Sequence, residues 1–74
     1  MKEIQQIKAI LEKQETLLKI NNKAILELER KLEKTENSQE LSRLRLFINR
    51  YKELNKEVKK GIKCNKEILK VLEK

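Results

Sequence analysis

Apolar residues, with a few polar ones in their place, recur along the chain at alternating steps of three and four. These steps define heptads in which positions a and d face a partner helix. In the first half, a and d are Ile4, Ile7, Leu11, Gln14, Leu18, Asn21, Ile25, Leu28, Leu32 and Thr35. In the second half they are Leu41, Leu44, Ile48, Tyr51, Asn55, Val58, Ile62, Asn65, Leu69 and Leu72. The pattern predicts amphipathic helices of the coiled-coil type.

A polar cluster, residues 35–39, separates the two halves. Asn37, with Glu40 three positions later, or Ser38 alone can cap the start of a new helix. One continuous helix is the alternative, because neither Gly nor Pro interrupts the pattern. We favour the break, since Asn and Ser compete for backbone hydrogen bonds in a way that suits caps. The sequence thus predicts one domain, residues 1–74, with a helix over 2–35, a turn over 36–39 and a helix over 39–73.

Antiparallel packing of the two halves gives a consistent register. If facing core residues have numbers that sum to about 76, apolar pairs close both ends and Asn21 meets Asn55 in the middle. A buried Asn pair fixes register at a cost in stability. The same register pairs Leu11 with Asn65, Gln14 with Ile62, Glu29 with Arg45, Glu15 with Lys59 and Asn22 with Lys52. The predicted fold is therefore all-α, an antiparallel two-helix hairpin.

A second apolar stripe lies at heptad positions g and c, beside the seam. We call it the g/c face, and its members are Ile10, Leu17, Ile20, Ala24, Phe47, Leu54, Gly61, Cys64, Ile68 and Val71. The apolar surface is wider than a two-stranded seam requires. We expect it to bind a second copy in a four-helix bundle, or a different helical protein. Gly61 would admit a close helix contact or Leu17, with a kink as the alternative.

Positive charge is concentrated in the second half of the chain. The whole chain carries +7, of which residues 1–36 hold +1 and residues 37–74 hold +6. Seven basic residues form one row, the cationic stripe: Arg45, Lys52, Lys56, Lys59, Lys63, Lys66 and Lys70. Such a row can follow an RNA or DNA backbone, without reading bases because no aromatic residue interrupts it. The alternative is that the row forms salt bridges with Glu12, Glu15, Glu29 and Glu33 across the hairpin.

The composition gives little material for catalysis or cofactor binding. With no His, one Gly and the single Cys64, we expect no enzyme activity, no metal, no cofactor and no small-molecule substrate. Apolar runs never exceed three residues, so we expect neither a signal peptide nor a membrane span, but a soluble, cytoplasmic protein. Membrane-surface binding is disfavoured because Trp is absent.

Ser38-Gln39-Glu40-Leu41 resembles part of the S-Q-E-L-D signature of a family of small helical-hairpin aspartyl-phosphate phosphatases that act on a sporulation response regulator. The resemblance implies a two-helix hairpin with this segment near the start of the second helix. It covers four residues, and Ser42 stands where the signature has Asp. Without that acidic residue we expect no phosphatase activity.

Together these patterns predict a non-catalytic module for protein–protein interaction or assembly that acts through the g/c face. The alternative is a basic hairpin that binds the backbone of a nucleic acid through the cationic stripe.

Overall fold

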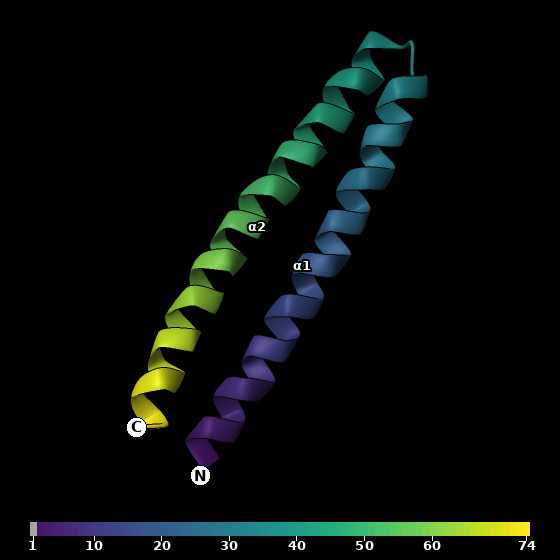
Figure 1. Ribbon diagram of the computed structural model, residues 1–74. Coiled ribbons are helices and arrows are strands. Elements are labelled where there is room, and N and C mark those ends of the chain that lie inside the picture. Colours follow the sequence, from purple (N-terminus) through teal and green to yellow (C-terminus); the bar gives the residue numbers. More distant parts are fainter. Residues whose placement is uncertain (1) are drawn as a thin grey trace.

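The chain forms two long helices that lie side by side in opposite directions (Figure 1). The structure is a computed structural model that describes residues 2–74. Helix α1 spans Lys2–Lys34 and helix α2 spans Ser38–Leu72, and together they make a rod of 55 × 14 × 13 Å. The turn lies at one end of the rod, and the start of α1 and the end of α2 lie at the other (Figure 1). The predicted antiparallel hairpin is confirmed, and the alternative of one continuous helix is wrong.

The turn is short because Asn37 caps α2 directly. Its backbone is extended, with φ −74° and ψ 120°, and its side-chain Oδ1 accepts the N–H groups of Gln39 at 2.9 Å and Glu40 at 3.3 Å. Leu41 N–H then donates to the Asn37 carbonyl at 2.9 Å, which closes the first helical turn. These bonds satisfy N–H groups that a helix start otherwise leaves without a partner. The segment from Ser38 to Leu41 is therefore the first turn of α2.

Helix α1 ends where Thr35 donates hydrogen bonds to carbonyl groups of its last turn. The Thr35 hydroxyl donates to the Lys31 carbonyl at 2.7 Å, and the Thr35 N–H donates to the Leu32 carbonyl at 3.4 Å. Lys31 and Lys34 lie in this last turn, where positive charge is favoured by the helix dipole. Both helices begin with the complementary sign, since Glu3 and Glu40 lie in their first turns. Local chemistry therefore fixes where each helix stops and starts.

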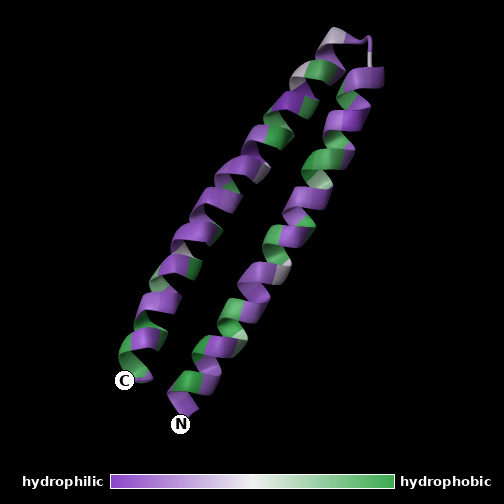
Figure 2. Cartoon of the chain, viewed as in Figure 1, coloured by the Kyte–Doolittle hydropathy of each residue, from purple (hydrophilic) through white to green (hydrophobic). Residues whose placement is uncertain are grey.

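The core is the single seam between α1 and α2. Every buried residue occupies an a or d position: Leu11, Asn21, Ile25, Leu44, Ile48, Asn55 and Ile62. The remaining a and d positions are half-buried, except Leu72, which is exposed at the open end. Hydrophobic bands recur along both helices and alternate with hydrophilic stretches (Figure 2). The heptad pattern thus predicts the buried face of each helix correctly.

The seam is too narrow to shield any side chain from solvent completely. Among residues 2–74, no side chain is completely shielded from solvent. The radius of gyration is 16.8 Å, whereas a compact domain of this length has one of about 11 Å. A small, thin fold of this kind has little apolar surface with which to offset the entropy of folding.

Removal of the cap tests the account of the turn. We expect Asn37→Ala to lower the free energy of unfolding by about 1 kcal/mol, because two N–H groups of α2 lose their acceptor. Urea denaturation followed by circular dichroism measures the change. Ser38→Ala is the matched control, since the Ser38 side chain makes no hydrogen bond within residues 2–74. An equal loss in both variants would show that Asn37 is not the dominant cap.

Candidate interaction surfaces

A buried polar layer crosses the seam near the middle of the rod. Asn21 Nδ2 donates to Asn55 Oδ1 at 3.0 Å, and both residues are almost fully buried, at 5% and 6% exposure. Asn55 Nδ2 in turn donates to Asn22 Oδ1 at 3.0 Å. The structure thus brings together the predicted Asn21 and Asn55 and adds Asn22, which the sequence reasoning had paired with Lys52. Every buried polar side-chain atom within residues 2–74 has a hydrogen-bond partner.

A second polar contact lies closer to the open end. Asn65 Nδ2 donates to Gln14 Oε1 at 3.2 Å. The expected neighbours were Leu11 for Asn65 and Ile62 for Gln14, and the sequence did not predict this diagonal hydrogen bond. Gln14 also lies beside Gly61, next to its expected neighbour Ile62. Gln14 reaches one turn along the seam because two amides that meet avoid the cost of leaving either one unbonded. Gln14 and Asn65 are both polar d positions, which is the signal that could have paired them.

Gly61 makes room for Gln14. A Cβ atom at Gly61 would lie 2.7 Å from Gln14 Nε2, far inside ordinary contact. The backbone of Gly61 has an ordinary helical conformation, since no residue among 2–74 has a positive φ. The neighbour of Gly61 across the seam is therefore the Gln14 amide, where the sequence analysis expected Leu17 or a close helix contact. Neither a kink nor special backbone freedom is needed to explain this glycine.

The g/c face runs along one broad side of the hairpin and is contributed by both helices. Eight of its ten members are exposed: Ile10, Leu17, Ile20, Phe47, Leu54, Cys64, Ile68 and Val71. The other two, Ala24 and Gly61, are small and half-buried. Large side chains are much exposed here, with 54% for Leu54 and 46% for Phe47. The apolar members of this face are therefore uncovered. The face has a low point at Ala24, whereas the Gln14 amide occupies the space beside Gly61.

Two exposed leucines lie outside this face and were missed from the sequence. Leu26 is 56% exposed and Leu46 is 50% exposed. They occupy a b and an f position, so neither extends the g/c face. Isolated apolar residues on a surface are ordinary and need no partner to explain them.

A hollow lies on the g/c side where Ala24 leaves space between the helices. Its volume is about 350 Å³, and it is lined by Ala24, Glu27, Leu28, Lys31, Phe47 and Tyr51. α1 supplies four of these residues and α2 supplies two, so the hollow is bounded from both sides. It has the dimensions to receive an apolar side chain from another helix.

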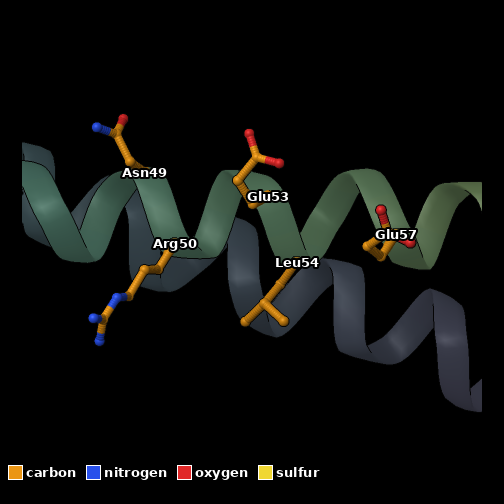
Figure 3. Close-up of a pocket in the computed structure, with 5 residues that line it drawn as sticks. All are labelled: Asn49, Arg50, Glu53, Leu54 and Glu57. Carbon is orange, nitrogen blue, oxygen red and sulfur yellow. The ribbon is translucent and has the colours of Figure 1, made fainter.

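A separate hollow of about 440 Å³ follows the outer surface of α2 (Figure 3). Asn49 and Glu53 extend to one side of the helix, and Arg50 and Leu54 extend to the other. All five lining residues, with Glu57 as the fifth, belong to this one helix. A hollow with a single wall cannot surround a small molecule, as binding pockets do.

The cationic stripe is exposed along its whole length on α2. Within residues 2–74 only two ion pairs lie within 4 Å, Lys56 with Glu53 at 3.4 Å and Lys60 with Glu57 at 3.6 Å, and both are internal to α2. Lys56 is the sole member of the stripe in such a pair. The six members without an ion pair in this part of the chain are Arg45, Lys52, Lys59, Lys63, Lys66 and Lys70.

The acidic residues of α1 that could oppose the stripe stay apart from it. Glu12, Glu15, Glu29 and Glu33 make no ion pair within 4 Å with any described residue. The expected contacts of Glu29 with Arg45 and of Glu15 with Lys59 are absent. Exposed ion pairs contribute at most about 1 kcal/mol and must order two long side chains. Pairing these exposed charges would therefore add little stability.

The described residues include no group of three or more metal-ligating side chains of the His, Cys, Asp and Glu types. Cys64 has a free, exposed thiol. No helix within residues 2–74 is both long and apolar enough to cross a bilayer. The chain matches no protein-family model, no curated protein and no solved structure.

Replacement of the Asn pair tests its role in register. We expect the double variant Asn21→Leu with Asn55→Leu to raise the midpoint of thermal unfolding, because two buried amides give way to apolar packing. We also expect it to lose a unique register, visible as more than one set of backbone amide signals by NMR. Asn49→Leu, on the exposed surface of α2, controls for added hydrophobicity. A double variant less stable than the wild type would show that the pair holds the hairpin together.

Proposed function

We propose that this protein is a non-catalytic interaction module that binds a helical protein surface through its g/c face. The observation that carries the proposal is a row of exposed apolar side chains at g and c positions, on a hairpin whose only core is one seam wide. A partner helix laid along this face would shield the large side chains that water now contacts. The gain from burial is about 25 cal/mol for each Å² of apolar surface.

The total surface of the chain supports the need for a partner. The chain exposes 6341 Å². A compact monomer of 8.9 kDa exposes about 4,800 Å², so the excess is roughly 1,500 Å². A standard protein–protein interface buries about 800 Å² on each side. The hairpin therefore offers ample area for a stable complex without any change in its fold.

The shape and chemistry of the face select the kind of partner. The rod is 55 Å long and straight enough for extended helix packing, and its low point at Ala24 suits knobs from a neighbouring helix. Charged residues flank the apolar ones at the same heptad positions, as at the polar rim of an interface. An amphipathic helix or helix pair fits this surface best.

Site-specific photo-crosslinking in cells that express the chain tests the proposal. With a photoreactive amino acid in place of Leu54, we expect a discrete protein adduct after illumination. The same amino acid in place of Glu67, an exposed f position of α2, is the matched control and should give none. Leu54→Glu should remove binding while helix content by circular dichroism stays unchanged, because this side chain does not support the seam. Equal adducts from both positions, or none from either, would contradict the proposal.

A second candidate function is binding of an RNA or DNA backbone by the cationic stripe. The specific observation in its favour is that six of its seven side chains have no ion-pair partner within residues 2–74. Their charges are therefore available to phosphates, and the row extends about 37 Å at the helical rise. Binding of this kind would be insensitive to sequence and would weaken steeply as salt rises.

Charge reversal distinguishes this candidate. If the stripe binds nucleic acid, Lys59→Glu with Lys63→Glu should lower affinity for duplex RNA or DNA more than about tenfold, since two phosphate contacts become repulsive. Fluorescence anisotropy at two salt concentrations measures the affinity. Lys23→Glu with Arg30→Glu, at f positions of α1, makes the same change in net charge and should alter binding little. An absence of wild-type binding at low salt would exclude the candidate.

A further inference from the structure

Large and small side chains alternate on the g/c face in a way that matches the face to itself. The inter-helix hydrogen bonds of the polar layers join residues whose numbers sum to between 76 and 79. This register places Leu17 of α1 and Gly61 of α2 at the same height along the rod, which we call a level. One heptad further on, Ala24 and Leu54 share the next level. Each level therefore holds one large residue and one small residue, and the helix that carries the large one changes between levels.

We infer that the partner at the g/c face is a second copy of this chain, packed face to face with its turn at the opposite end. This inference rests on the proposed function of the face. The two copies are related by a two-fold axis that lies in the plane of their contact and runs perpendicular to the rod. The axis passes midway between the level of Leu17 and the level of Ala24, so it brings each level of one copy against the other level of the second copy. Leu17 then packs on Ala24 of the second copy, and Leu54 packs over Gly61 of the second copy, next to the Gln14 amide that occupies the Cβ position there. Leu17 of the second copy then lies at the edge of the hollow of about 350 Å³ that begins at Ala24.

The same axis places other residues of the face in favourable contact. Ile20 meets its own symmetry mate, and Phe47 approaches Ile68 of the second copy. Lys13 approaches Glu27 of the second copy, so opposite charges flank the apolar centre. Glu57 is the one acid brought near its own mate, and Lys60 lies 3.6 Å from it on the same helix and offsets its charge.

The alternative two-fold axis, along the rod, fits less well. It would also place large residues on small ones at the two central levels. However, it would bring Lys34 against Arg43 of the second copy, twice by symmetry, and Ile20 against Glu57. Like charges placed directly opposite each other suppress an association. The axis along the rod also places Ile10 near Ile68 and Glu27 near Arg50 of the second copy, whereas the perpendicular axis leaves Ile10 facing Lys31. The perpendicular axis opposes no two basic residues of the g and c positions, and on that ground we place the axis there.

The distribution of charge favours self-association through the g/c face over self-association through the side that carries the cationic stripe. The g and c positions hold five basic and four acidic residues, a net charge of +1: Lys13, Lys31, Lys34, Arg43 and Arg50 against Glu3, Glu27, Glu40 and Glu57. The cationic stripe lies at e and b positions and would face outward in the dimer. Two copies can thus approach without opposing the net +7 of each chain directly.

Sedimentation equilibrium of the purified chain, with three variants, tests the inference. We expect the wild type at micromolar concentration to have twice the monomer mass of 8.9 kDa. Ala24→Leu fills the hollow and should weaken the dimer about tenfold or more. Adding Leu17→Ala should restore affinity to within about threefold, because the large and small residues have then exchanged places. With the axis along the rod, no rescue would occur, since Leu at position 24 would meet Leu54.

A crosslinking measurement gives an independent readout. In a Cys64→Ser background, Ile20→Cys should form a covalent dimer with a short bis-maleimide, because position 20 lies on the axis. Lys23→Cys in the same background is the matched control, faces outward and should remain monomeric under denaturing electrophoresis. A dimer without rescue and without the Ile20→Cys crosslink would overturn the perpendicular arrangement. A chain that stays monomeric at tens of micromolar would overturn self-association, while a cellular adduct at Leu54 would still uphold the proposed function.

Discussion

Each helix of this protein has a single neighbour, so a side chain is shielded only where it points at the seam. That constraint explains why the buried residues are confined to a and d positions and why none is enclosed completely. It also explains why apolar residues at g and c positions remain exposed to solvent in a single hairpin. The proposed function follows from the same limit, because a third or fourth helix is the simplest cover for the second stripe.

The polar layers give the seam its specificity. Leucine and isoleucine pack against one another in many registers, whereas amides must meet atom to atom or remain unbonded in a buried site. One set of hydrogen bonds between amides joins Asn21, Asn22 and Asn55. Another joins Gln14 to Asn65 near the open end. These contacts align the two helices lengthwise, and that alignment sets Leu17 level with Gly61 and Ala24 level with Leu54. The pattern of the outer face thus depends on hydrogen bonds inside the seam.

The sequence predicted those features that depend on periodicity and on strong local rules. The heptads identify the seam, Asn37 marks the start of the second helix, and the antiparallel register pairs Asn21 with Asn55 correctly. The contact of Gln14 with Asn65 was missed because long amides reach diagonally, about one turn away from the residue directly opposite. The ion pairs expected for Glu15 and Glu29 failed for a different reason. Exposed charges on long side chains gain too little from pairing to hold one geometry.

What covers the g/c face could not be derived from periodicity, since a wide apolar stripe suits any helical neighbour. The structure shows which residues of the two helices lie side by side along the rod. It also shows the hollow at Ala24 and the space that Gly61 leaves for Gln14. Such details depend on which side chains meet across the seam. They become visible only when both helices are in place.

The three-residue turn between Lys34 and Ser38 also affects how the fold forms. It joins the two helices covalently, so their pairing is a unimolecular event. Contacts between the helices beside the turn close short loops, whereas those at the open end close loops of almost the whole chain. Loop closure becomes less favourable as the loop lengthens, and folding rates fall with the sequence separation of contacts. We therefore expect assembly of the seam to begin at the turn and to proceed towards the termini, where Leu72 is exposed in the folded hairpin.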